Sequence, residues 1–137
     1  MSTLLEVQHL KKYFDVKSGV LHAVDDVSFS IEKGETLGVV GESGCGKSTL
    51  GRVLLHLLDN TGGRILYKGE DVTKVSRQKL SELRKEMQLI FQDPYASLNP
   101  RMTIYQTIEE PMKIAGGYSK KAMEERVYEI MDTVGLA

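Results

Sequence analysis

The chain contains 137 residues, of which 41% are hydrophobic and 27% are charged, a composition typical of a globular domain. Its formal net charge of −1 gives no electrostatic basis for binding nucleic acid or an anionic membrane surface. No apolar run approaches the roughly 20 residues that cross a bilayer, and charged residues interrupt the N-terminal stretch where a signal peptide has its apolar core, so we expect a cytoplasmic location and no nucleic-acid partner.

The first 35 residues predict a pair of strands. Apolar and polar residues alternate from Leu5 to Leu10, the pattern of a half-buried strand, and Lys17-Ser18-Gly19 is a turn signal. A second strand region precedes the turn residues Glu32–Glu35. Two strands joined by a glycine-containing turn are expected to pair antiparallel. The apolar positions of the second strand are Val24, Val27, Phe29 and Ile31.

Residues 36–57 predict a strand, a glycine-rich loop and a helix, in that order. Thr36–Val40 is a short apolar run typical of a buried strand, and Leu50, Val53, Leu54 and Leu57 are spaced as on one face of a helix. Between them the sequence fits G-x-x-x-x-G-K-[ST] without mismatch, in the structural context that this motif requires. The loop consists of Gly41, Glu42, Ser43, Gly44, Cys45, Gly46, Lys47, Ser48 and Thr49.

This motif predicts a site for a nucleoside triphosphate and Mg²⁺. Glycines let backbone N–H groups approach phosphates closely, and the start of the helix adds unpaired N–H groups and a positive dipole end. Lys47 is expected to reach the β- and γ-phosphates, and the Ser48 hydroxyl to bind Mg²⁺. Thr49 could donate to the α-phosphate. The motif alone distinguishes neither ATP from GTP nor hydrolysis from transfer.

Two residues, one in the loop and one after it, have less specific interpretations. Cys45 is the only cysteine, which excludes a disulfide framework and a Cys-based metal site within the chain. Its place near a helix N-terminus could make the thiol reactive, although a small filler at a variable motif position is the favoured interpretation. His56 lies four residues after Arg52 and opposite the apolar stripe, which predicts a solvated side chain.

The remaining residues predict alternating strands and helices. Arg64–Tyr67 is a short strand, Ser76–Glu86 is a helix with Ser76 as its N-cap and Leu80 and Leu83 buried, and Met87–Phe91 is a strand-like run. Two prolines make Gln92–Thr103 a loop.

Two further helices are expected after this loop. Thr103 is placed to cap the first, which Pro111 should perturb, and Gly116-Gly117 breaks the chain before Ser119 opens the second. The apolar stripe of this last helix is interpreted as core packing and consists of Met123, Val127, Ile130, Met131 and Val134.

This arrangement resembles the nucleotide-binding domain of ABC transporters. Tyr13 lies 28 residues before Gly41, and Gln92 ends a predicted strand about 45 residues after Lys47. The segment from Phe91 to Thr103 is more specific, because it looks like the ATP-binding subunits of bacterial oligopeptide and dipeptide importers, a subfamily that includes nickel importers. The resemblance extends from about Leu4 to Ala137.

The resemblance implies ATP and Mg²⁺ as cofactors. Tyr13 would stack on the adenine, an interaction worth roughly 1–3 kcal/mol in nucleic-acid systems, with the adjacent Phe14 as an alternative. Gln92 would contact Mg²⁺ and the attacking water. The implied catalytic residues are therefore Lys47 and Gln92, the metal ligands are Ser48 and Gln92, and the nucleotide is held by Tyr13 and residues 41–49.

The resemblance also implies an α/β P-loop NTPase fold and a set of partners. Residues 1–35 would form an antiparallel β region, residues 36–92 an incomplete RecA-like phosphate-loop core, and residues 93–137 the glutamine loop and the start of a helical subdomain. The implied partners are transmembrane permease subunits, a second ATP-binding subunit and, indirectly, an extracytoplasmic solute-binding protein. The protein would then be peripheral at the inner face of the membrane.

Three motifs of the family are missing from these 137 residues: the Leu-Ser-Gly-Gly-Gln signature, the apolar strand ending in Asp-Glu, and the switch histidine. We therefore interpret the chain as the N-terminal part of a longer protein. Alone it should bind ATP weakly, hydrolyse it poorly and have an open sheet edge. The second ATP-binding subunit would be reached through the missing signature region.

Other functions remain open on sequence grounds. A soluble ABC-type ATPase that acts on nucleic acid or the ribosome would use the same phosphate loop, although the net charge and the segment after Phe91 argue against it. A P-loop kinase or GTPase would not require Tyr13 or the upstream strands. A nucleotide-binding fragment without activity is the fourth possibility.

Overall fold

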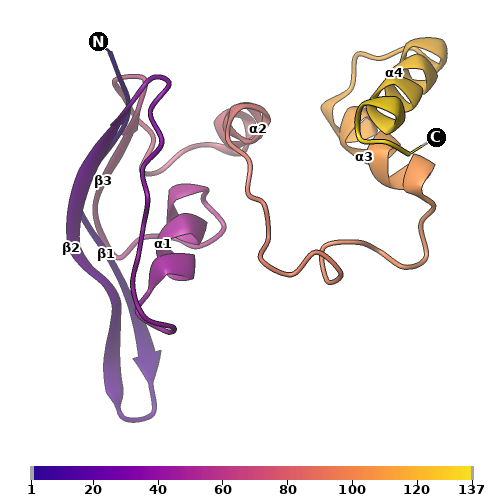
Figure 1. Cartoon of the computed structure of the whole chain (residues 1–137). Helices are drawn as coiled ribbons and strands as arrows, with labels where there is room; N and C mark the ends of the chain where they lie inside the picture. Colours follow the sequence, from indigo (N-terminus) through magenta and orange to yellow (C-terminus); the bar gives the residue numbers. More distant parts are fainter. Residues whose placement is uncertain (1, 137) are drawn as a thin grey trace. The chain divides into compact units, whose positions relative to one another are not determined.

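The computed structural model of the chain describes residues 2–136. They form two compact units, the first containing residues up to Leu89 and the second containing residues from Ile90 onward. Among the described residues, the first unit holds all the strands and two helices, and the second unit holds two helices (Figure 1).

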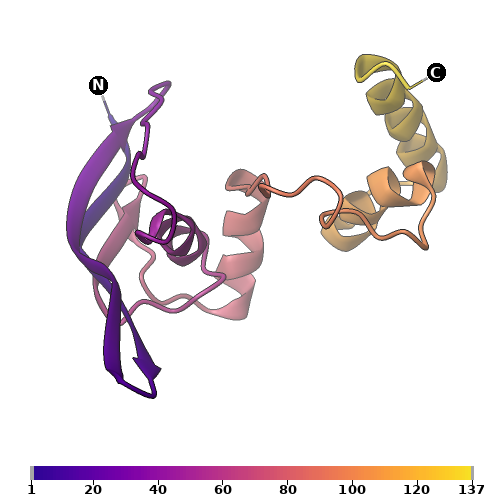
Figure 2. The ribbon, with the colours of Figure 1, turned by 60° about the horizontal axis from the view of Figure 1, so that its bottom comes forward.

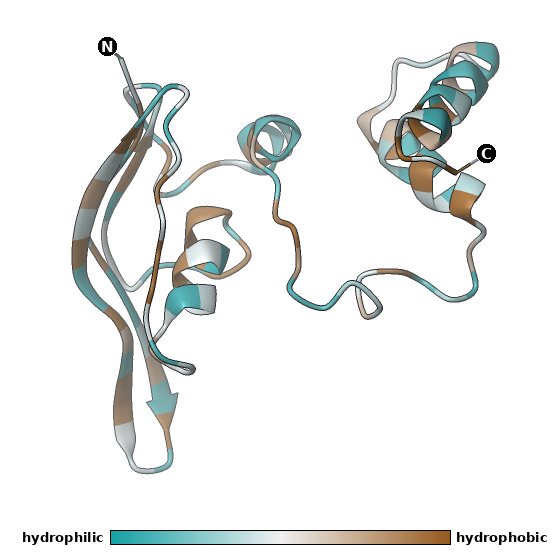
Figure 3. Cartoon of the chain, viewed as in Figure 1, coloured by the Kyte–Doolittle hydropathy of each residue, from teal (hydrophilic) through white to brown (hydrophobic). Residues whose placement is uncertain are grey.

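The first unit is built on a four-stranded antiparallel sheet in the order β2-β1-β3-β4. The expected antiparallel pairing of the first two strands is confirmed, because β1 and β2 form a long hairpin in which Tyr13 pairs with His22. Polar and apolar residues alternate along this hairpin (Figure 3), as expected for strands with one face toward a core. The strands are β1 (Thr3–Val16), β2 (Gly19–Glu32), β3 (Gly62–Tyr67) and β4 (Glu70–Asp71).

Two helices, α1 (Lys47–Leu54) and α2 (Arg77–Glu86), lie on the same side of this sheet (Figures 1 and 2). Their apolar side chains and those of the strands form one buried cluster. Such burial stabilises the unit by about 25 cal/mol for each Å² of apolar surface removed from water. The cluster consists of Val7, Leu10, Val24, Leu50, Val53, Ile65, Val72 and Leu83.

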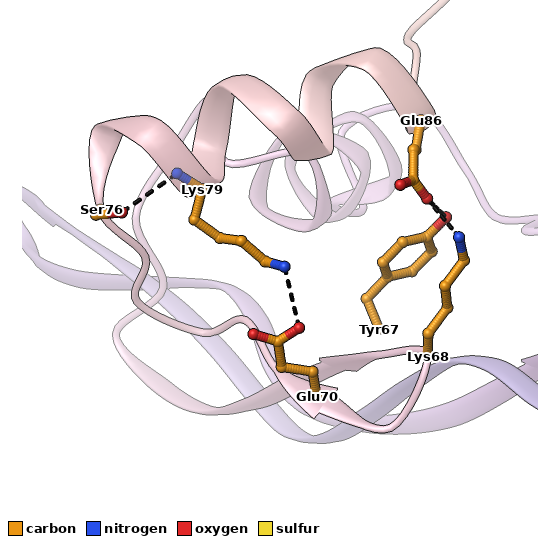
Figure 4. Close-up of polar contacts among 6 residues, drawn as sticks. All are labelled: Tyr67, Lys68, Glu70, Ser76, Lys79 and Glu86. Carbon is orange, nitrogen blue, oxygen red and sulfur yellow. Dashed lines mark hydrogen bonds and ion pairs between the residues drawn. The ribbon is translucent and has the colours of Figure 1, made fainter.

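Polar contacts attach both ends of α2 to the β3–β4 hairpin (Figure 4). At the C-terminal end, Glu86 accepts from Lys68 Nζ at 2.6 Å and from the Tyr67 hydroxyl at 2.9 Å, and these bonds lower the pKa of Glu86. At the N-terminal end, Lys79 Nζ donates to Glu70 at 3.0 Å. Ser76 accepts from the Lys79 N–H at 3.2 Å, which confirms Ser76 as the N-cap. These exposed contacts orient the helix more than they stabilise it.

Two predicted strands are wrong. Thr36–Val40 and Met87–Phe91 are both extended chain without strand assignment, and within residues 2–136 no segment forms a ladder with either. Val40 is 93% exposed and Ile90 is 94% exposed. The apolar pattern identifies residues suited to burial, whereas a strand also requires a neighbour that satisfies its N–H and C=O groups.

The end of α1 also differs from expectation. The helix stops at Leu54, so Leu57 lies outside it, and His56 adopts a left-handed conformation with φ of 57°. The His56 side chain is half-buried rather than solvated, in a small cavity lined by residues of α2 that include Leu83 and Arg84. Its Nε2 atom is buried without a hydrogen-bond partner among the described residues.

The second unit contains a helical hairpin of α3 (Ile104–Ala115) and α4 (Lys120–Thr133). Both predicted N-caps are confirmed: Thr103 forms a capping box with Gln106, and Ser119 accepts from the Ala122 N–H at 3.1 Å. Pro111 lies inside α3 without ending it.

The predicted apolar stripe of α4 is buried only at its centre. Val127 is fully buried, whereas Val134 is exposed beyond the end of the helix. Tyr128 on α4 contacts Tyr105 on α3 edge to face, with ring centroids 5.8 Å apart.

None of the helices within residues 2–136 combines the length and hydrophobicity needed to cross a membrane.

The position of His56 predicts a pH-dependent stability. Burial lowers the pKa of His56 from 6.5, the nearby Arg84 lowers it further, and Asp59 opposes these effects. The folded state therefore favours the neutral form of His56. The contribution of this preference to the free energy of unfolding is complete above pH 6.5, and it is lost as the pH falls through the lowered pKa.

Thermal unfolding of the wild type and of His56→Asn between about pH 7.5 and about pH 5 tests this prediction. Asparagine tolerates the left-handed backbone and does not titrate. The variant should lose less stability than the wild type over this range. Equal losses in the two proteins would show that His56 does not contribute.

Candidate functional site

The glycine-rich loop curls around the ammonium group of Lys47. Lys47 Nζ donates to the carbonyl oxygens of Gly41 at 2.6 Å and Glu42 at 2.8 Å, and it lies 3.6 Å from Cys45 Sγ. The Cys45 N–H donates to the Glu42 carbonyl oxygen at 3.2 Å. The loop therefore surrounds one positive charge with two backbone carbonyl oxygens and one sulfur atom.

Two glycines of the loop lie in close contact with other atoms. Gly46 has φ of 102°, and a Cβ there would overlap the carbonyl oxygen of Ala23 on β2. A Cβ on Gly41 would lie 2.6 Å from Cys45 Sγ. The loop is therefore packed against both β2 and itself, and at Gly46 glycine is required by a backbone contact as well as by backbone conformation.

The N-terminus of α1 presents free donors beside Lys47. Gly46 is the N-cap and provides no side-chain acceptor, and the first intrahelical bond runs from the Leu50 N–H to the Gly46 carbonyl oxygen at 2.8 Å. The N–H groups of Lys47, Ser48 and Thr49 have no acceptor among the described residues. The start of α1 thus offers free backbone N–H groups, a lysine and the positive end of the helix dipole. These are the groups that bind a polyanion such as a phosphate chain.

The same helix end offers one oxygen suited to a hard cation. The Ser48 side chain is exposed in the first turn of α1, and hydroxyl oxygens are ligands that Mg²⁺ accepts. Within residues 2–136 there is no group of three or more His, Cys, Asp or Glu side chains that could hold a metal ion. The donor set therefore fits Mg²⁺ that arrives bound to phosphate oxygens.

Tyr13 is connected to the loop through β2. Its ring is stacked on His22, with centroids 3.9 Å apart and planes at 14°, and its hydroxyl donates to Asp25 at 2.5 Å. This hydrogen bond raises the pKa of Tyr13 and lowers that of Asp25. Ala23, the residue after His22, contacts Gly46. Tyr13 and the loop thus contact neighbouring residues of β2, namely His22 and Ala23.

The sequence interpretation missed His22 and Asp25. Neither belongs to a motif, but the pairing of β1 with β2 places His22 opposite Tyr13. Counting register outward from the Lys17-Ser18-Gly19 turn could have found this pair. Phe14, the alternative stacking residue, pairs instead with Leu21 and lies 5.0 Å from the Lys12 ammonium.

Gln92 belongs to the second unit, whereas the loop belongs to the first. It precedes Asp93, whose side-chain oxygen accepts from the N–H groups of Tyr95 at 2.9 Å and Ala96 at 3.2 Å. These bonds shape the turn that follows Gln92. The role of Gln92 as a ligand of Mg²⁺ remains a prediction.

Comparison with known proteins gives consistent matches. The profile of the ABC transporter family matches residues 24–137. The chain is 54% identical to the oligopeptide transport ATP-binding protein OppF of Bacillus subtilis, over 97% of the chain and 44% of that protein. It is 45% identical to the dipeptide transport ATP-binding protein DppF of Escherichia coli, over 97% of the chain and 42% of that protein. The chain thus spans less than half the length of these relatives.

Solved structures confirm the fold. A bacterial ABC transporter cassette solved as a dimer matches with a TM-score of 0.81 at 21% identity, over 98% of the chain and 58% of the cassette. That cassette has also been solved in a post-hydrolysis state bound to ADP and phosphate. The CbiO1 protein of Clostridium perfringens matches with a TM-score of 0.76 at 26% identity, over 99% of the chain and 52% of that protein. The predicted fold class, an N-terminal portion of such a cassette, is therefore confirmed.

The contact between Gly46 and Ala23 predicts that a single methyl group added at Gly46 lowers the stability of the chain strongly. Gly46→Ala should destabilise the chain by about 1–3 kcal/mol from the left-handed backbone alone, and the overlap with the Ala23 carbonyl oxygen should add to this loss. Thermal unfolding measures the change.

Gly51 provides the matched control for this substitution. It lies inside α1, and no atom outside its own helix turn lies within 4 Å of the position that a methyl group would take there. Gly51→Ala should therefore leave stability unchanged or raise it by up to about 1 kcal/mol, because alanine favours helix. A Gly46→Ala variant as stable as Gly51→Ala would contradict the packing described for the loop.

Proposed function

The chain belongs to the ABC transporter family, and we propose that it is the ATP-binding part of a subunit that energises the transport of oligopeptides or dipeptides. The observation that carries the proposal is the phosphate loop. It combines the Lys47 ammonium, the free N–H groups at the start of α1 and Gly46, which has no room for a side chain. The names of the relatives, which are oligopeptide and dipeptide transport proteins, support the substrate class.

Binding of a triphosphate would use these groups directly. Phosphate oxygens are stronger acceptors for an ammonium than the neutral carbonyls of Gly41 and Glu42, because both partners are then charged. Lys47 would exchange these carbonyls for the β- and γ-phosphates, while the N–H groups of residues 47–49 donate to the same anion. Tyr13 would stack on the adenine.

Mg²⁺ would be held by the Ser48 hydroxyl and the phosphates, with Gln92 as a further ligand. When bound, the ion neutralises charge that develops on the transferred phosphoryl group. Ser48 is available for this role because its side chain is exposed beside Lys47. Gln92 would in addition orient the attacking water.

We assign ATP hydrolysis to the complete protein. These 137 residues contain no Leu-Ser-Gly-Gly-Gln motif and no apolar strand ending in Asp-Glu, and phosphoryl transfer needs a positioned water and a metal held from two sides. The chain alone should bind ATP without efficient turnover.

The partners follow from the proposed role. Transmembrane permease subunits would receive the signal through the segment after Gln92, a second ATP-binding subunit would complete the dimer, and an extracytoplasmic solute-binding protein would act indirectly. The subunit would be peripheral at the inner face of the membrane. The relatives named above are transport proteins, which favours this role over a soluble ABC-type ATPase.

Lys47→Ala tests the phosphate site. Loss of a charged donor to phosphate should weaken MgATP binding by roughly 10- to 100-fold, the equivalent of about 1.5–3 kcal/mol. Lys74→Ala, which removes an exposed lysine outside the loop, should leave the affinity unchanged. Isothermal titration of the 137-residue chain with MgATP gives both constants. Equal binding by the Lys47→Ala variant and the wild type would contradict the assignment.

Phosphate release by the same chain tests the assignment of hydrolysis. With saturating MgATP, the rate should stay at the level of the Lys47→Ala variant, because these residues lack the strand ending in Asp-Glu that catalysis in the family requires. Turnover that exceeds this background and disappears in Lys47→Ala would show that residues 1–137 suffice for catalysis.

A further inference from the structure

One carboxylate holds both rings of the Tyr13–His22 stack. Asp25 accepts from the Tyr13 hydroxyl at Oδ1, and its Oδ2 lies 3.6 Å from His22 Nδ1. The rings are nearly parallel, at 14°, with centroids 3.9 Å apart. Tyr13 is also held at its backbone, because its N–H donates to Thr61 Oγ1 at 2.9 Å.

This arrangement fixes the direction of the Tyr13 ring. His22 covers one face of the ring, and among the described residues no second aromatic ring covers the other face. The hydrogen bond from the Tyr13 hydroxyl to Asp25 restrains rotation of the ring about its side-chain torsions. A planar base can therefore stack on only one side. Immobilising a side chain before binding removes a cost that association otherwise carries.

We propose that His22 and Asp25 are positioning residues, which hold Tyr13 in the orientation for stacking on the nucleotide base and leave a single face available to it. This inference rests on the proposed binding of ATP. It extends the site from Tyr13 alone to a cluster of three side chains on two strands.

Stability of the fold does not account for this cluster. The Tyr13, His22 and Asp25 side chains lie outside the buried core, and polar contacts at exposed positions contribute little to folding. A second exposed pair on the same hairpin, His9 with Asp26 at 2.6 Å, lacks a stacked ring. This pair provides a control with the same chemistry and no contact with Tyr13.

The test compares the affinities of the 137-residue chain for MgATP and for magnesium tripolyphosphate, which lacks a base. Stacking should make MgATP the tighter ligand in the wild type, and Tyr13→Ala should remove this preference. His22→Ala should reduce the preference by about two- to tenfold through the lost preorganisation, and so should Asp25→Ala. His22→Phe, which restores a flat ring, should recover it.

Two controls separate positioning from general damage. Tripolyphosphate affinity should be equal in all these proteins, because the loop is untouched, and His9→Ala should keep the wild-type preference. If the wild type binds neither ligand, the proposed function fails. If Tyr13→Ala loses the preference while His22→Ala and Asp25→Ala keep or increase it, ATP binding stands and this inference is overturned.

Discussion

The close packing of Gly46 against the Ala23 carbonyl oxygen is the constraint on which the rest of the site depends. It fixes the end of the glycine-rich loop on β2 and sets where α1 begins. Because α1 starts there, Lys47 is its first residue, and the free N–H groups of residues 47–49 lie at the same helix end as the Lys47 backbone. The chemistry of the loop is thus a consequence of a backbone contact that excludes every side chain.

The β1–β2 hairpin has two functions in this arrangement. Its central part packs Val7, Leu10 and Val24 into the core, and its outer part carries the Tyr13, His22 and Asp25 cluster. The glycine-rich loop and Tyr13 therefore both contact β2, because Ala23 touches the loop and His22 touches Tyr13.

The segment before the loop is extended but is not part of the sheet. Thr36–Val40 leads directly into the loop, yet Val40 is almost fully exposed and its backbone has no ladder partner within residues 2–136. Extended apolar chain of this kind readily accepts another strand. The loop is thus held firmly on its β2 side and by α1, and less firmly by the segment that precedes it.

By itself, the sequence determined the features that depend on neighbouring residues. The phosphate loop, the hairpin turn and the caps Ser76, Thr103 and Ser119 could all be predicted, because a turn or cap is satisfied within three or four positions. Tertiary structure alone decided which apolar runs became strands. It also decided that His56 is half-buried against α2 and that Asp25 and His22 hold Tyr13. These features depend on partners far along the chain, such as Thr61 for the backbone of Tyr13, and a local pattern carries no information about which distant group will supply the missing contact.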